Sequence, residues 1–229
     1  MDIYIILLKI FMGFLIFILT VGILFREEVK AARERDPAAK TNIEIVLLYC
    51  GFHAIVFYRI AHVLWNMKIP LVPRALSQLA RFFTGIEIHP GATIGHGLFI
   101  DHGTGVVIGE TAILGDNITL FQGVTLGGTG KEKGKRHPTL GSNIVVGTGA
   151  KVLGNITIGD NAYIGANAVV IKDVPANSTV VGVPGRITKQ DGKKIDVSMD
   201  HIHVLDPVMQ QIEELNKKIQ QLEEKLKEK

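Results

Sequence analysis

Apolar residues recur at every sixth position through the middle of the chain, and this period constrains the fold more than any other feature. A spacing of six fits neither the 3.6-residue period of a helix nor the two-residue period of a half-buried strand. It fits a β-solenoid in which each six-residue unit is a short strand plus a turn, three units close one coil, and the apolar side chains stack inside. The periodic residues form three runs: Ile88, Ile94, Ile100 and Val106; Ile108, Leu114, Leu120 and Leu126; Leu140, Val146, Val152, Ile158, Ile164 and Val170.

Turn-forming residues follow many of these apolar positions. Gly115-Asp116-Asn117 and Gly159-Asp160-Asn161 are two such segments. Glycine and asparagine adopt a positive φ at little cost, so we expect them at the corners of the coils. The pattern predicts a solenoid over residues 85–188.

The composition fits a folded protein of one or two domains. The chain has 229 residues, of which 47% are hydrophobic and 21% charged, and its net charge of +3 is too small to indicate a nucleic-acid partner. Cys50 is the single cysteine, which excludes an internal disulfide and fits a reducing compartment. Because Cys50 lies in an apolar stretch, we expect it to be buried.

Residues 1–26 are predicted to form a membrane anchor. The run from Ile3 to Phe25 contains one charged residue, Lys9, and is long enough to cross a bilayer, which takes about 20 residues. Basic residues follow it, and the positive-inside rule then puts the rest of the chain in the cytoplasm, on the inner face of the membrane. A helix buried in an oligomer contact is the alternative. A cleaved signal peptide fits less well, because the basic residues come after the apolar run: Arg26, Lys30, Arg33 and Arg35.

Residues 27–84 are predicted to be helical. Thr41 and Glu44 have the spacing of a capping box, which starts a long helix over residues 43–67. A shorter helix is expected over residues 74–83, ahead of the solenoid.

The C-terminal part is predicted to be a linker, residues 189–205, and a helix, residues 206–229. Asp206 suits the N-cap of that helix and Pro207 its first turn. Apolar residues then alternate at spacings of four and three, which is typical of a short coiled coil. An amphipathic helix packed on its own chain is the alternative for the same residues: Val208, Ile212, Leu215, Ile219, Leu222 and Leu226.

Candidate functional residues lie where the six-residue period is interrupted. The segment 127–139 is rich in glycine and basic residues, a composition that suits binding of phosphate or carboxylate. A two-residue shift follows Asp101 and His102. A histidine beside an aspartate at a solenoid corner has the composition of a general base with an acidic neighbour, although such pairs are also common as structural features.

The segment from about residue 36 to residue 186 resembles serine O-acetyltransferase, a hexapeptide-repeat acyltransferase. The pair of motifs TLGGTGK and RHP at this spacing is far more specific than hexapeptide repeats alone. The matching segments are RDPA (35–38), GFHA (51–54), YRIAH (58–62), IHP (88–90), DHGTG (101–105), GETA (109–112), VTLGGTG (124–130), RHP (136–138), GNI (154–156) and GVPGR (182–186).

The resemblance implies a left-handed parallel β-helix that forms a trimer, with active sites between neighbouring subunits. It also implies transfer of an acetyl group from acetyl-CoA to the hydroxyl of L-serine, the first step of cysteine biosynthesis, without a metal. His102 would be the general base. Asp36 and Asp101 would bind the ammonium group of serine, and Arg136 and His137 its carboxylate.

Two further groups of residues follow from the resemblance. The family has a carboxylate fifteen residues before the base, usually Asp, that orients the imidazole; here this position is Glu87. The longer side chain keeps the charge but moves it by one methylene. The coenzyme A groove of the family corresponds to Gly127, Gly128, Thr148, Lys151 and Ala166.

The chain departs from the family pattern at both ends. An apolar segment replaces part of the longer N-terminal helical domain that joins two trimers in some members. The sequence ends in Lys229 rather than in the Ile with which some members insert into cysteine synthase, the partner that the resemblance suggests.

Three other functions remain open from the sequence. One is a hexapeptide acetyltransferase for a sugar or amino sugar, against which Asp36 and the RHP segment argue. Another is a metal-dependent γ-type carbonic anhydrase, with His96 and His102 as ligands. The third is a non-catalytic, membrane-tethered trimeric scaffold, which only Glu87 favours.

Overall fold

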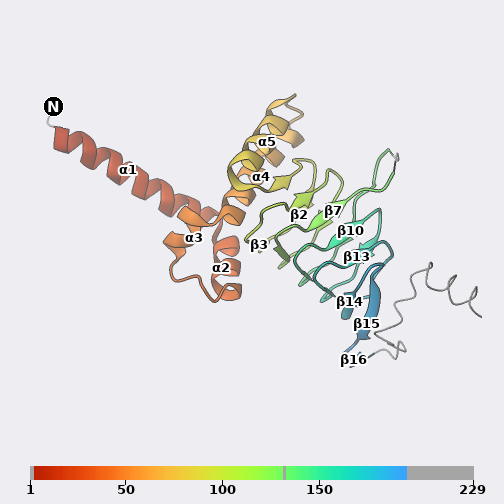
Figure 1. Cartoon of the computed structure of the whole chain (residues 1–229). Helices are drawn as coiled ribbons and strands as arrows, with labels where there is room; N and C mark the ends of the chain where they lie inside the picture. The colour runs from red at the N-terminus through yellow and green to blue at the C-terminus, as the bar shows by residue number, and fades with distance from the viewer. Residues whose placement is uncertain (1–2, 131–132, 195–229) are drawn as a thin grey trace, which may run out of the picture. The chain divides into compact units, whose positions relative to one another are not determined.

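The computed structural model describes residues 3–130 and 133–194, a helical N-terminal part followed by a β-helix (Figure 1). The predicted C-terminal helix, residues 206–229, lies outside the described residues, as does most of the predicted linker. The helices are α1 (Ile3–Leu24), α2 (Arg26–Arg35), α3 (Asn42–Leu48), α4 (Cys50–Asn66) and α5 (Val72–Thr84).

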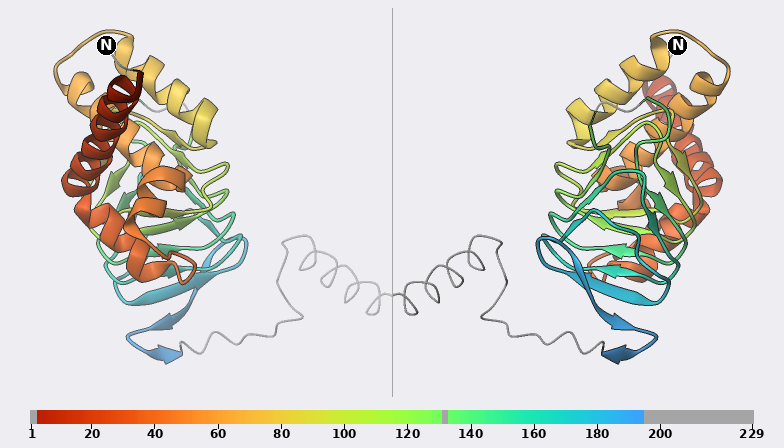
Figure 2. Two further views of the ribbon diagram at one scale, coloured as in Figure 1. Left: turned by 90° about the vertical axis from the view of Figure 1, so that its left-hand side faces the viewer. Right: turned by 90° about the vertical axis from the view of Figure 1, so that its right-hand side faces the viewer.

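The β-helix has three faces, each a sheet of parallel strands apart from two strands at its end. Its coils stack along one direction in both views of Figure 2. The first face contains β1 (Glu87–Ile88), β4 (Val107–Ile108), β7 (Thr125–Gly127), β10 (Lys151–Leu153) and β13 (Val169–Val170). The second contains β2 (Thr93–Ile94), β5 (Ile113–Leu114), β8 (Thr139–Leu140) and β11 (Thr157–Ile158). The third contains β3 (Phe99–Asp101), β6 (Thr119–Phe121), β9 (Val145–Val146), β12 (Tyr163–Ile164), β14 (Ser178–Val181), β15 (Arg186–Gln190) and β16 (Lys193–Lys194).

The hexapeptide fold predicted from the sequence is confirmed. Every apolar residue of the six-residue pattern is buried, and each such side chain contributes roughly 1.5–3 kcal/mol by leaving water. Most units also bury the residue two positions earlier, as Ile86 before Ile88 and Ile118 before Leu120, which adds a second row of inward side chains. The expected corner residue Asn117 has φ 59°.

The strand register locates the two interruptions. Val107 pairs with Thr125 and Lys151 pairs with Val169, so an ordinary coil advances by 18 residues. The first coil is longer by two residues, because Glu87 pairs with Val107. The coil between Thr125 and Lys151 is longer by eight residues, because it contains the glycine-rich and basic segment. Both insertions leave the ladders intact and project from corners.

The end of the β-helix differs from its body. The strands β15 and β16 are antiparallel to their neighbours and extend the third face beyond residue 188, where we expected the linker to begin. These antiparallel strands cover the edge of the last parallel strand, β14, so no further parallel coil can be added there.

The predicted helix over residues 43–67 is wrong as a single element. Its start is confirmed, because the Glu44 amide donates to Thr41 Oγ1 at 3.1 Å. However, Tyr49 is extended (φ −83°, ψ 109°), and the axes of α3 and α4 differ by 69°. Helix α3 packs against α1, whereas α4 packs against the β-helix, where a Cβ on Gly51 would lie only 2.1 Å from the Ile100 carbonyl oxygen.

Two smaller expectations also need correction. Helix α5 begins earlier than predicted, with Pro73 in its first turn, where a proline is favourable, and it ends before Gly85 (φ 72°). Cys50 is exposed rather than buried, and it is the first residue of α4.

Helix α1 is long and apolar enough to cross a membrane, and it projects away from the β-helix (Figure 1). Most of its side chains are exposed, including Ile10 and Phe11, and Ile18 is its buried contact with the rest of the chain. The apolar surface of α1 therefore has few partners within the described residues.

Polar side chains dock the helices onto the first coil. The Tyr58 hydroxyl donates to the Ala92 carbonyl at 2.7 Å, and Arg59 donates to the Ile94 carbonyl at 2.6 Å. The other guanidinium nitrogen of Arg59 contacts the buried carboxylate of Glu28 at 3.1 Å. These bonds pair the edge carbonyls of the first coil and fix α2 and α4 against it.

Candidate active site

The first insertion shapes the corner between the third and first faces. Asp101 ends β3, and His102 follows with φ 57°, a conformation that points its side chain out of the coil. The side chain is 75% exposed, and its Nε2 lies 3.9 Å from Asp101 Oδ1. Gly103 (φ 80°) completes the turn, and a Cβ there would lie 2.4 Å from Ile86. The two extra residues therefore present an accessible imidazole beside a carboxylate.

Asp36 directly follows α2, which packs against β3. Its Oδ1 accepts from the Ala38 amide at 2.8 Å, and its Oδ2 accepts from the Tyr49 hydroxyl at 2.6 Å. Burial, followed by the negative charges of Asp36, Glu44 and Asp101, raises the pKa of Tyr49 to about 12. Tyr49 thus holds one of the two aspartates predicted to bind the ammonium group, and the charge of the other contributes to its raised pKa.

Glu87 lies on β1, with its carboxylate toward α5. It forms an ion pair with Arg81 Nη1 at 3.1 Å and approaches Arg74 Nη2 at 4.0 Å. Within the described residues it makes no hydrogen bond to His102, so its role in orienting the imidazole stays a prediction. Its ion pairs with the two arginines also give Glu87 a structural role, which is to hold α5 against β1.

The second insertion ends at the corner between the first and second faces, where Thr111 organises it. The Thr111 hydroxyl accepts from the amides of Arg136 at 3.0 Å and His137 at 3.1 Å. It lies 2.8 Å from His137 Nδ1, and the Thr111 amide donates to the same nitrogen at 3.2 Å. Because Nδ1 accepts, a neutral His137 has its proton on Nε2.

His137 is buried at this corner, whereas the side chains of Arg136 and Glu110 beside it are 35% and 37% exposed. Burial, then the charge of Arg136, lowers the pKa of His137, and its ring lies against Gly109, where a Cβ would be 2.1 Å from Nε2. Arg136 Nη2 donates to Glu110 Oε2 at 2.8 Å. Lys135 donates to the Thr111 carbonyl at 2.7 Å, and burial lowers its pKa. The RHP segment is thus clamped to the coil beside it.

One chain does not bring the two corners together. Asp101 and His102 lie before the first face, whereas Arg136 and His137 follow it, and a side of six residues spans up to about 20 Å. The predicted serine-binding residues therefore fall into two groups on one chain.

The residues predicted to line the coenzyme A groove follow the first face. Lys151, on β10, donates to the Gly123 carbonyl and to Thr125 Oγ1 at 3.1 Å. Gly127 and Gly128 lie at the end of β7, Thr148 at the corner before β10 and Ala166 at the corner before β13. The Gly127 carbonyl accepts from the Gly154 amide at 2.9 Å and the Thr148 carbonyl from the Asn167 amide at 2.8 Å, while Gly128 and Ala166 are exposed.

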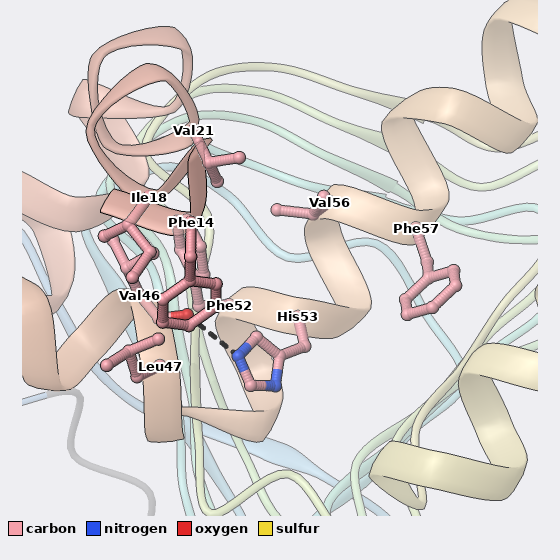
Figure 3. Close-up of a pocket in the computed structure, with 9 residues that line it drawn as sticks. All are labelled: Phe14, Ile18, Val21, Val46, Leu47, Phe52, His53, Val56 and Phe57. Atoms are coloured by element: carbon pink, nitrogen blue, oxygen red, sulfur yellow. Dashed lines mark hydrogen bonds between the residues drawn. The ribbon is translucent and has the colours of Figure 1, made fainter. Parts of the chain in front are cut away.

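An apolar pocket of about 230 Å³ lies elsewhere, between α1, α3 and α4 (Figure 3). Its one titratable residue is His53, whose Nε2 lies 2.9 Å from the Val46 carbonyl oxygen. A hydrogen-bonded imidazole among apolar side chains offers no nucleophile or acid–base pair. This pocket does not coincide with any predicted catalytic residue.

The described residues also bear on the metal-dependent alternative. His96 and His102 lie at opposite ends of β3, and the His96 amide, rather than its ring, bonds to Asp116 Oδ1 at 2.7 Å. No group of three or more His, Cys, Asp or Glu residues that could hold a metal ion is found in this part of the chain.

Sequence reasoning missed Tyr49 and Thr111. Nothing in the sequence marks Tyr49, because it lies inside an apolar run that reads as one helix. Thr111 lies in the GETA segment quoted for the resemblance, and its hydroxyl could have been suspected from its place opposite the insertion. The structure identifies both through their hydrogen bonds.

A coiled parallel β-helix with an exposed Asp-His pair and a basic inserted loop is the architecture of hexapeptide-repeat transferases. Residues 137–172 match the model of the bacterial transferase hexapeptide family, described as six repeats. The chain is 56% identical over 195 residues to a serine acetyltransferase of Staphylococcus aureus, covering 85% of this chain and 92% of the relative. It is 56% identical over 206 residues to that of Bacillus licheniformis, covering 90% and 95%.

Solved structures agree with this match. The chain aligns with the crystal structure of the Neisseria gonorrhoeae serine acetyltransferase at a TM-score of 0.73 and 44% identity, covering 80% of this chain and 70% of that one. A structure of the same enzyme in complex with serine aligns at a TM-score of 0.71, covering 75% and 70%. The chain belongs to the serine acetyltransferase family.

Proposed function

We propose that the protein is a serine O-acetyltransferase, which transfers the acetyl group of acetyl-CoA to the hydroxyl of L-serine and yields O-acetylserine and CoA. The Asp101–His102 pair at the two-residue insertion is the observation that supports this most directly, because it presents an accessible base beside a carboxylate. The extent of identity to serine acetyltransferases supports the choice of serine over a sugar acceptor.

In the proposed reaction, His102 removes the proton from the serine hydroxyl as its oxygen attacks the thioester carbonyl. A neutral alcohol is a poor nucleophile, so this transfer is what the base must provide. The tetrahedral intermediate then collapses, the carbon–sulfur bond breaks, and the imidazolium returns the proton to the CoA thiolate. Glu87 is proposed to orient the imidazole through its charge.

The serine substrate is proposed to bridge two subunits. Asp36 and Asp101 bind its ammonium group at one corner, while Arg136 and His137 of a neighbouring subunit bind its carboxylate. A guanidinium fork and a neutral Nε2–H donor both suit that group. This arrangement makes a homotrimer, or a higher homo-oligomer, the working form, and the separation of the two corners on one chain supports it.

Acetyl-CoA is proposed to lie along the first face, against Gly127, Gly128, Thr148, Lys151 and Ala166. Small side chains leave backbone amides and carbonyls accessible to the pantetheine arm, and the Lys151 ammonium suits a phosphate. The reaction needs no metal.

Helix α1 is proposed to anchor the enzyme to the cytoplasmic face of a membrane. Its exposed apolar surface supports an anchor, and a contact between subunits is the other use of the same surface. With an anchor, full-length protein stays in the membrane fraction after high-salt and alkaline washes, and a variant starting at Glu27 is soluble and acetylates serine. Recovery of the full-length protein without detergent would support the subunit contact instead.

His102→Ala tests the proposed reaction. Loss of a general base is expected to lower kcat by about 10²-fold or more, measured as thiol release from acetyl-CoA, with acetyl-CoA binding unchanged. His96→Ala is the matched control, because His96 is a corner histidine at the other end of β3. Equal rates for the two variants would contradict the assignment of the base.

A further inference from the structure

The Tyr49 hydroxyl holds one of the two carboxylates at the acceptor corner. It donates to Asp36 Oδ2 at 2.6 Å, a length typical of a bond to an ionised acceptor. The Ala38 amide donates to the other oxygen at 2.8 Å. With both oxygens bonded, the Asp36 carboxylate cannot rotate, and its remaining lone pairs keep a fixed direction.

The bend between α3 and α4 places Tyr49 there. Tyr49 is the extended residue between the two helices, and α4 then lies against the Ile100 backbone through the close approach at Gly51. That contact brings the phenol beside β3, close enough for the Asp101 charge to act on it. Helices α2 and α4 both pack on β3, and Tyr49 packs against the same core cluster as Phe52 and Phe99, so the phenol lies beside the strand that ends in Asp101.

The Tyr49 phenol is a donor throughout the neutral and mildly alkaline range. Burial, then the adjacent carboxylates, raises its pKa to about 12, so its proton stays in place at any ordinary assay pH. It can neither act as a base nor add a negative charge to a site built for a cation. Its contribution to the site is a fixed hydrogen bond.

The end of α2 is held independently of Tyr49. Arg35 Nη1 donates to the Gly97 carbonyl at 3.2 Å and to the Ile118 carbonyl at 3.3 Å, both on the β-helix. The same nitrogen donates to Thr119 Oγ1 at 3.2 Å. Arg35 thus fixes the backbone beside Asp36, which leaves Tyr49 to fix the direction of the carboxylate.

We propose that Tyr49 is a positioning residue of the acceptor site, which aims the Asp36 carboxylate so that it and Asp101 face a single ammonium group of the acceptor. This inference rests on the proposed function, because the ammonium is that of serine. Acceptors with a free amino group gain from this arrangement, and acceptors without one do not.

Tyr49→Phe tests the proposal, with Tyr58→Phe as its control. Loss of one bond to a charged group is expected to raise the KM for serine about tenfold, with kcat and the KM for acetyl-CoA within about twofold of the parent. Tyr58 lies on α4, and its buried hydroxyl donates to the Ala92 carbonyl rather than to a carboxylate of the site. Tyr58→Phe is therefore expected to lower the melting temperature and leave the KM for serine unchanged.

A double-mutant cycle with Asp36→Asn separates positioning from a general structural effect. If Tyr49 acts through Asp36, the double variant has the same KM for serine as Asp36→Asn alone. A parent-like KM in Tyr49→Phe, or effects of the two substitutions that multiply, would overturn the proposal. A parent protein that fails to acetylate serine would instead reject the proposed function itself.

Discussion

Substitution of Gly51 by alanine tests whether the approach of α4 to β3 builds the acceptor corner. A Cβ on residue 51 would lie 2.1 Å from the Ile100 carbonyl oxygen and 3.0 Å from Ile100 Cβ. Ordinary contact requires α4 to move by about 1 Å, and such overpacking costs about 1–3 kcal/mol. In an unhindered helix the same change is favourable by about 1 kcal/mol.

The net expectation for Gly51→Ala is a loss of up to about 2 kcal/mol in the free energy of unfolding, which for a chain of this size lowers Tm by up to about 8 °C. The same displacement moves Tyr49 away from Asp36. Since a misplacement of about 1 Å can cost 10²-fold in rate, we expect kcat/KM for serine to fall at least about tenfold. Thermal unfolding followed by circular dichroism and initial rates of thiol release measure the two effects.

Gly13→Ala is the matched control, because no atom lies within 4 Å of a Cβ at this helical glycine. It is expected to keep the Tm and the kcat/KM of the parent. If Gly51→Ala also keeps both, α4 does not need its close approach to β3, and the account of this corner is wrong.

Three further predictions concern other parts of the site. Thr111→Val removes the hydroxyl that bonds the Arg136 and His137 amides, and it should raise the KM for serine about tenfold while the KM for acetyl-CoA stays within about twofold; a defect confined to acetyl-CoA would place this loop in the donor site. Burial, then the charge of Arg74, lowers the pKa of His89 from 6.5 to about 4, so the folded state disfavours its protonation. The stability that this shift contributes is present above pH 6.5 and is lost as the pH falls towards 4, and His89→Gln should flatten the decline of Tm in that range; an unchanged slope would exclude His89 as its source. If Glu87 orients the base, Glu87→Gln should lower kcat and Glu87→Asp should not, and equal, parent-like rates would make Glu87 structural.

The β-helix could be predicted in detail from the sequence because its core repeats locally. Each inward residue is set by its place in a six-residue unit, so Leu120 and Val146 could be assigned without knowing any distant contact. The helical part was predicted less accurately. The bend at Tyr49 arises because α3 packs on α1 while α4 packs on β3, and the local sequence contains no signal for either contact.

The residues of the candidate site also divide into those that local sequence indicates and those that depend on distant contacts. His102 and Asp101 were predicted because the insertion disturbs the period next to them, and Arg136 because its segment resembles a known family. The hydrogen bonds of Tyr49 and Thr111 join residues 13 and 25 or 26 positions apart, so the structure was needed to see them. The ion pairs of Glu87 with α5 were equally hidden, since they depend on where that helix docks.

The acceptor preference of the purified full-length enzyme tests the central claim most directly. Thiol release from acetyl-CoA is measured in parallel with L-serine, homoserine and glucosamine, and the product is identified by mass spectrometry. We predict that serine has the highest kcat/KM and that the product is O-acetylserine, with homoserine weaker and the amino sugar inert. A higher kcat/KM for the amino sugar, or no thiol release with serine, would contradict the account.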